Sequence, residues 1–161
     1  MSAESRASGR VAGLQRSGGG VPKLPVDRVQ VNLAGIEGDW QRDRRHHGGP
    51  DRALCLYSVD LIERLLAEGH PIFPGAIGEN VTVGGIDWRL MIAGVRLTVG
   101  PVAIELTEFA VPCSTIAAAF IDRRIARVGE KANPGWSRIY ARVLRAGSIA
   151  VGDPVAITSS P

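Results

Sequence analysis

Short stretches in which apolar and polar residues alternate recur along the chain. Alternation with a period of two predicts a strand that buries one face, and glycine- and proline-containing segments such as Gly100-Pro101 predict turns between strands. The strands predicted from alternation or from a short apolar run span residues 28–32, 53–57, 80–83, 95–99, 102–107, 138–143 and 155–158. Several short strands with glycine-rich turns are typical of a barrel or a sandwich.

A closed barrel has the further advantage that it leaves no exposed strand edge. We therefore expect a mainly β fold, a closed β-barrel of about seven or more strands with a few peripheral α-helices. One helix is predicted over residues 59–68, where Leu61 begins an apolar stripe with the spacing of a helix face. Ser58 or Asp60 is placed to cap its start, and Gly69 to end it.

The length of 161 residues fits one domain. Residues 1–20 are rich in serine, glycine and arginine and are predicted to be a poorly ordered tail, which leaves residues 21–161 as a single domain. No apolar run approaches the roughly 20 residues that span a bilayer, and the first ten residues lack the apolar centre of a signal peptide. We therefore expect a cytoplasmic protein with no membrane partner.

Composition changes this picture only slightly. Hydrophobic residues make up 45% of the chain and charged residues 22%, both ordinary for a globular protein. The net charge is +3 and arginine dominates it, with clusters at residues 42–45 and 123–127. Arginine suits the planar recognition of phosphate and carboxylate, which favours an anionic ligand. Nucleic acid is disfavoured, because only 5% of residues are aromatic and few bases could be stacked.

Cys113 is the first candidate for chemistry. It lies between the strand predicted over residues 102–107 and a second, alanine-rich helix predicted from about Ser114 to Arg127, with a break near Asp122 as the alternative to a continuous helix. The free N–H groups and partial positive charge of a helix start stabilise a thiolate, the form that ligates metals or attacks sulfur, and Ser114 adds a hydrogen-bond donor. The alternative is that Cys113 is a small buried apolar residue. Cys55 lies within an apolar run and is predicted to be structural.

Two further segments are candidates for a binding site. His46-His47-Gly48-Gly49-Pro50-Asp51-Arg52 is the densest polar cluster, and its adjacent histidines suit anion binding or proton relay. The alternative is a simple turn in which the glycines supply unusual dihedral angles. The loop over residues 75–80 runs into a strand but lacks the Gly-Lys-Ser/Thr of a phosphate loop, and its Asn80 is placed to point an amide at a ligand.

Several segments together resemble the MOSC domain family, named for the C-terminal part of the molybdenum cofactor sulfurases. The most recognisable is Pro74-Gly75-Ala76-Ile77-Gly78-Glu79-Asn80-Val81-Thr82-Val83, and Pro112-Cys113 falls where the family has its cysteine. The other matching segments are residues 20–26, 35–39, 46–57 and 147–155. The histidine-containing segment is similar to that of stand-alone bacterial members, a branch associated with resistance to N-hydroxylated bases.

This resemblance implies a β-barrel with helices around it. It implies that Cys113 either ligates the metal of a molybdenum–pterin cofactor, since soft metals accept a thiolate, or carries sulfur as a persulfide. The phosphate of the pterin would bind arginine and backbone N–H donors. The residues predicted to line the cofactor are Asn80, Arg52, Arg45, Ser114 and Gly78, and those predicted to donate protons are His46 and His47.

Three functions follow as hypotheses. The first is a molybdenum-cofactor oxidoreductase that reduces N-hydroxylated small molecules with electrons from an external donor. The second is a sulfur carrier that takes sulfur from a donor onto Cys113 and passes it on. The third is a non-catalytic module that binds an anionic partner. The pyridoxal phosphate of the sulfurases is a family association only, and we expect no Schiff-base lysine at Lys23 or Lys131, the only lysines.

Overall fold

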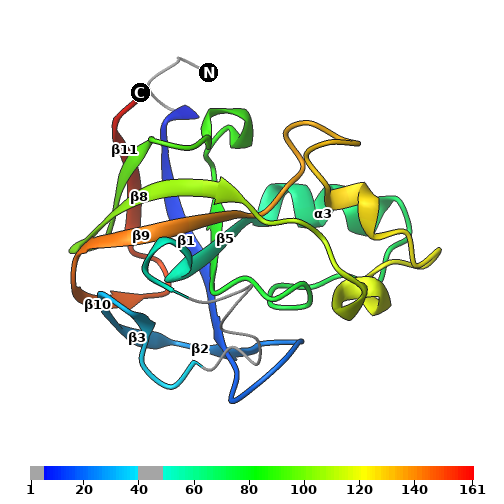
Figure 1. Ribbon diagram of the computed structural model, residues 1–161, viewed down its shortest axis with the longest axis horizontal. Coiled ribbons are helices and arrows are strands. Elements are labelled where there is room, and N and C mark those ends of the chain that lie inside the picture. The colour runs from blue at the N-terminus through cyan, green and yellow to red at the C-terminus, as the bar shows by residue number, and fades with distance from the viewer. Residues whose placement is uncertain (1–5, 40–48) are drawn as a thin grey trace.

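A closed barrel is the central feature of the computed structural model, which describes residues 6–39 and 49–161 (Figure 1). In this part of the chain seven strands follow one another around the barrel in the order β11-β7-β8-β9-β5-β6-β1, and the pairing of β11 with β1 closes it. Their bounds are β1 Ser8–Arg16, β5 Leu54–Ser58, β6 Val81–Gly84, β7 Arg96–Val99, β8 Val102–Phe109, β9 Ile139–Arg145 and β11 Pro154–Ser159. The predicted β-barrel is therefore confirmed.

Four shorter strands complete the sheets. β2 (Leu24–Val26) extends the main sheet beside β1, while β10 (Gly147–Ala150), β3 (Arg28–Asn32) and β4 (Gly35–Ile36) form a small antiparallel sheet against the barrel. The strands of the barrel pair antiparallel except β5 and β6, which run parallel. A parallel pair needs a crossover connection, and the helix α3 (Val59–Ala67) supplies part of it.

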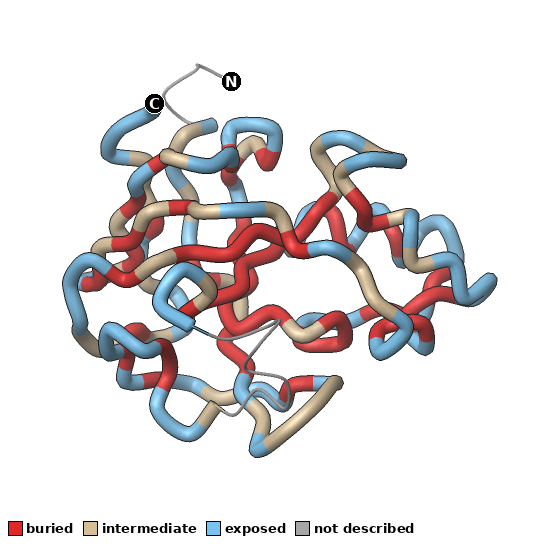
Figure 2. The backbone as a smooth tube through the Cα atoms, in the orientation of Figure 1, coloured by how far each residue is buried: buried red, intermediate tan, exposed pale blue. Residues whose placement is uncertain are grey.

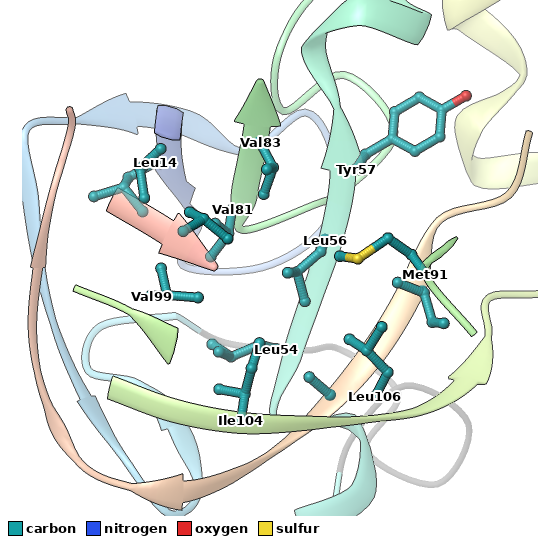
Figure 3. Packing of buried hydrophobic residues seen from close by; sticks show 14 of the residues in the cluster. Leu14, Leu54, Leu56, Tyr57, Val81, Val83, Met91, Val99, Ile104 and Leu106 are labelled. Atoms are coloured by element: carbon teal, nitrogen blue, oxygen red, sulfur yellow. The ribbon is translucent and has the colours of Figure 1, made fainter. Parts of the chain in front are cut away.

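The barrel interior is filled by the inward-facing side of each strand. Leu54, Leu56, Val81 and Ile104 point toward one another inside it (Figure 3), and none of them is exposed to solvent. Burial extends beyond the barrel into the lobe beside it (Figure 2). Full burial of one such aliphatic side chain contributes about 1.5–3 kcal/mol to folding, so the interior is the main source of stability.

The N-terminal prediction needs correction, because residues 8–16 form β1 and are not part of a poorly ordered tail. Val11 and Leu14 are both buried in the core. The glycines that suggested disorder permit close approach between strands: a Cβ on Gly9 would lie 1.9 Å from the carbonyl oxygen of Gly84 on β6. Glycine in a strand marks just this kind of backbone contact.

The helices differ in how well they match expectation. The predicted helix over residues 59–68 is confirmed as α3, whose start is capped by Ser58 Oγ accepting from Leu61 N at 3.2 Å. The predicted helix over 114–127 is instead two short 3₁₀ segments, η3 (Ser114–Ala119) and η4 (Ile125–Val128). Between them Asp122 accepts a hydrogen bond from Arg124 N at 3.0 Å, and such a local bond competes with a continuous helix.

Two further 3₁₀ turns are η1 (Pro50–Arg52) and η2 (Trp88–Leu90). Together with α3, η3 and η4 they are the helical elements of the described residues, and none of them is long and apolar enough to cross a membrane. The lobe that holds α3, η3 and η4 lies to one side of the barrel (Figure 1). Tyr57 of β5 points from the barrel wall toward this lobe (Figure 3).

Candidate functional site: a polar layer outside the barrel wall

Strand β5 is buried on both of its faces. Leu54 and Leu56 face the barrel interior, whereas Tyr57 points away from it toward the lobe (Figure 3). Cys55 shares the outer face and pairs with Tyr140 of β9. Cys55, Tyr140 and Ala110 form a small apolar cluster separate from the main core. Burial raises the pKa of the Cys55 thiol to about 11, so this thiol stays protonated at neutral pH, as expected for a structural cysteine.

Cys113 is the accessible thiol of the described chain. It is half-buried and extended, with φ −133° and ψ 167°, on the segment between β8 and η3. Its Sγ lies 2.8 Å from Thr115 Oγ1, a contact that orients the sulfur. Because η3 is a six-residue 3₁₀ segment, the expected stabilisation of a Cys113 thiolate by the start of an α-helix does not apply. Ser114 is exposed at the same turn, and its predicted role at the cofactor stays a prediction.

Tyr140 lies near both cysteines. Its pKa is raised to about 12, chiefly by burial, and the negative charge that Cys55 or Cys113 can carry raises it further. Arg52 places its guanidinium 5.3 Å from the centre of the Tyr140 ring. The same guanidinium donates from Nε to Glu108 Oε1 at 2.5 Å. We call the side chains of the site outside the barrel wall the polar layer: Lys23, Asp39, Cys55, Glu79, Asn80, Arg138 and Tyr140. Arg52 lies at the outer edge of this layer, and its charge is already paired with the carboxylate of Glu108.

Asn80 holds the inner end of the layer together. Its Oδ1 accepts from Cys55 N at 3.1 Å, and its Nδ2 donates to Asp39 Oδ2 at 2.9 Å. Asp39 in turn pairs with Lys23 at 2.7 Å, and both side chains are 7% exposed. Both ends of the Asn80 amide thus have protein partners in this structure. The predicted contact of Asn80 with a cofactor stays a prediction, and a structural role is directly observed.

The loop over residues 74–80 is shaped by glycine. Gly75 has φ +92°, and a Cβ there would lie 2.3 Å from the carbonyl oxygen of Lys23, so only glycine fits. Gly75 O also accepts from Lys23 N at 2.9 Å, which fixes the loop to the turn before β2. Gly78 has φ +88° and packs against Val21. This geometry presents Glu79 and Asn80 to the outer face of β5, while the predicted cofactor contact of Gly78 is not tested by it.

Sequence reasoning missed two residues of the layer, Glu79 and Arg138. Glu79 is fully buried and Arg138 is 6% exposed. Burial raises the pKa of Glu79 to about 7, and the charges of Arg138 and Lys23 only partly oppose this rise. Apolar and polar residues alternate over 138–143, and this alternation places Arg138 on the same face as Tyr140. The signal for Arg138 was therefore its register with the tyrosine.

Three predicted site residues, Arg45, His46 and His47, lie outside the described residues, so their roles stay predictions. Within residues 6–39 and 49–161, no group of three or more His, Cys, Asp or Glu side chains could hold a metal ion.

Comparisons with known proteins agree with this architecture. The model of the MOSC domain matches residues 43–156. The chain is 29% identical to the uncharacterized protein YflK of Bacillus subtilis strain 168 over 138 residues, 83% of this chain and 60% of that protein. It is 28% identical to protein YiiM of Escherichia coli K12 over 145 residues, 86% of this chain and 63% of that protein. It thus spans less than two thirds of the length of these relatives.

Solved structures share the fold. The YuaD protein of Bacillus subtilis superposes with a TM-score of 0.73 at 20% identity, covering 96% of this chain and 97% of that one. YiiM of Geobacillus stearothermophilus does so with a TM-score of 0.65 at 24% identity, covering 96% of this chain and 75% of that one. Since the family model covers well over half of its length, the chain belongs to the MOSC domain family.

Proposed function

We propose that this MOSC protein binds a molybdenum–pterin cofactor through the Cys113 thiolate and reduces N-hydroxylated compounds. The observation that carries the proposal is Cys113 itself, a half-buried thiol near the buried Tyr140, whose pKa it helps to raise. A relative named "Reductase" from Gibberella moniliformis, 30% identical over 139 residues, 83% of this chain and 24% of that protein, supports redox chemistry in related chains.

The residues present fit such a cofactor. A thiolate is a suitable ligand for a soft metal. The layer also contains a positively charged side chain that could bind a phosphate. Lys23 is paired with Asp39 and Arg52 with Glu108, whereas Arg138 forms no ion pair with any described residue. A buried guanidinium without a carboxylate favours an anionic ligand.

The reduction breaks one N–O bond, consumes two electrons and two protons and releases water. When bound, the cofactor supplies the electron transfer, and an external reductase refills it. The chain itself must supply protons and orientation. Glu79, whose pKa burial raises to about 7, holds a proton near neutral pH, and His46 and His47 are the further predicted donors. Thr115 orients the Cys113 sulfur.

A second candidate is favoured by the exposure of the Cys113 segment. Val111, two residues before Cys113, is 80% exposed, so a protein sulfur donor would meet little obstruction there. In this function the Cys113 thiolate would attack the outer sulfur of a donor persulfide, breaking its S–S bond and releasing the donor thiolate. The sulfur held as a persulfide on Cys113 would then pass as sulfide to a metal–sulfur cofactor, with two electrons from an external reductant.

Metal and pterin content tests the first function. The protein is expressed in a molybdenum-replete host, and molybdenum and oxidised-pterin fluorescence are measured for wild type, Cys113→Ala and Cys55→Ala. The last variant is the matched control, because Cys55 is buried and structural. We expect near-stoichiometric molybdenum in wild type and Cys55→Ala and its loss in Cys113→Ala. Equal molybdenum in all three refutes ligation by Cys113, and a persulfide on Cys113 without molybdenum favours the carrier.

A further inference from the structure

Three buried polar atoms of the layer have no hydrogen-bond partner among the described residues. They are Glu79 Oε2, Arg138 Nε and Arg138 Nη2. Most buried polar atoms in proteins are paired, so each exception calls for an explanation. Here the exceptions are concentrated on two residues of opposite formal charge that do not form an ion pair with each other. Arg138 bonds to the carbonyl oxygen of Ile77, two residues before Glu79, so both residues meet at the same loop.

The Arg138 side chain is held in a defined orientation. Its Nη1 donates to the carbonyl oxygen of Ile77 at 2.8 Å, and its backbone carbonyl accepts from Ala110 N at 3.0 Å. The remaining nitrogens, Nε and Nη2, form the edge of the guanidinium that binds two oxygens of one anion. Rotation to find another partner would break the bond to Ile77. The fork is therefore preorganised, and none of the described residues accepts a hydrogen bond from it.

Glu79 is held from the other side. Its Oε1 accepts from Gly75 N at 2.9 Å, which leaves Oε2 as the free oxygen. The charged or titratable groups near it are Arg138, the residue before β9, Lys23 of the turn before β2, and Cys55 and Tyr57 of β5. Lys23 is already paired with Asp39. A proton on Oε2 would convert this oxygen from an acceptor into a donor.

We propose that Arg138 and Glu79 together bind an oxoanion, with Arg138 donating from Nε and Nη2 and the protonated Glu79 donating from Oε2. The ligand class is a tetrahedral oxoanion such as a phosphate group. Its source is either a free inorganic ion or the phosphate end of a larger ligand, and the second source rests on the proposed function. All three atoms are enclosed by protein, so the site must open to admit the ion and close again to restore the bond between Arg138 and Ile77.

Sulfate is the probe of choice, because its charge does not change between pH 6 and pH 8. Isothermal titration of sulfate into metal-free protein is expected to give binding about tenfold weaker at pH 8 than at pH 6, as Glu79 loses its proton. Arg138→Met is expected to lose at least about tenfold in affinity at pH 6. Glu79→Gln keeps a donor at the same place, so it should retain affinity and lose the pH dependence.

Arg96→Met is the control, since Arg96 is an exposed arginine on β7. Far-UV circular dichroism and the melting temperature confirm folding of each variant, and Arg138→Lys, which keeps the charge but lacks the fork, replaces Arg138→Met if the latter does not fold. The inference is overturned if wild type binds neither sulfate nor a phosphate monoester, or if the Arg138 variant binds with the same affinity as wild type. Binding of the monoester without binding of sulfate assigns the source to the phosphate end of a larger ligand. None of these results depends on molybdenum content, so the proposed function is judged separately.

Discussion

Replacing Glu79 by glutamine should change how the stability of the protein depends on pH. Glutamine has the same shape, retains an oxygen that can accept from Gly75 N, and cannot ionise. In wild type, by contrast, the buried carboxyl must lose its proton as pH rises, in a setting where burial raises its pKa from 4.5 to about 7. The difference between the two proteins therefore isolates the ionisation of one side chain.

The sign and size follow from the two pKa values. Because the folded-state pKa is above that of the unfolded chain, the contribution of Glu79 to stability is fully present below about pH 4.5 and is lost as pH rises to about 7. The difference between a pKa of 4.5 and a pKa of about 7 corresponds to a free energy of about 3 kcal/mol. The free energy of unfolding of Glu79→Gln minus that of wild type should thus rise by about 3 kcal/mol between pH 4.5 and pH 8.

Urea denaturation at half-unit pH intervals measures this difference. Contributions of other titrating groups, including the histidines, cancel when the two curves are subtracted. Glu63→Gln on α3 is the control, because the Glu63 side chain is exposed, and no comparable rise is expected for it. A difference between Glu79→Gln and wild type that is flat, or that falls with pH, would refute the assignment of a buried, neutral Glu79.

Three further predictions concern the layer. Asn80→Ala removes the bonds to Cys55 N and Asp39 and should lower the free energy of unfolding by about 3 kcal/mol in urea titrations; an effect below about 1 kcal/mol would contradict its structural role. Lys23→Met removes the ion-pair partner of the 7%-exposed Asp39 and should lower the free energy of unfolding by about 3–5 kcal/mol, a loss that adding Asp39→Asn should partly restore. At pH 8 iodoacetamide should label native protein once, at Cys113, whereas Cys55, with a pKa of about 11, should react only after unfolding; mass spectrometry of Cys113→Ser checks both.

The sequence predicts the barrel well because apolar and polar residues alternate along its strands. β7 and β8 show the alternation on either side of Gly100-Pro101, and Val99 and Val102 pair across that turn in the structure. It predicts α3 equally well, since the apolar stripe and the Ser58 cap are both local signals. β1 was missed because its glycines serve contact with a strand some 70 residues away, which local composition cannot reveal.

The candidate site is predictable only in part for a related reason. Cys113 was found from its position between elements, although the helix expected after it is a short 3₁₀ segment. Asn80 was found as a polar residue at a strand start. Glu79 and Arg138 were not, because a glutamate and an arginine in a sequence are assumed to face water. Only tertiary packing shows that both are buried and that their polar atoms are partly unpartnered.

Double-sided burial of β5 has a consequence for engineering. A substitution on either face of this strand affects both the barrel interior and the polar layer, because the same five buried residues contribute to both. Altering ligand preference by changing β5 would therefore trade activity directly against folding. Val111 lies outside the strands and is 80% exposed, so it is a better position for variants meant to change specificity.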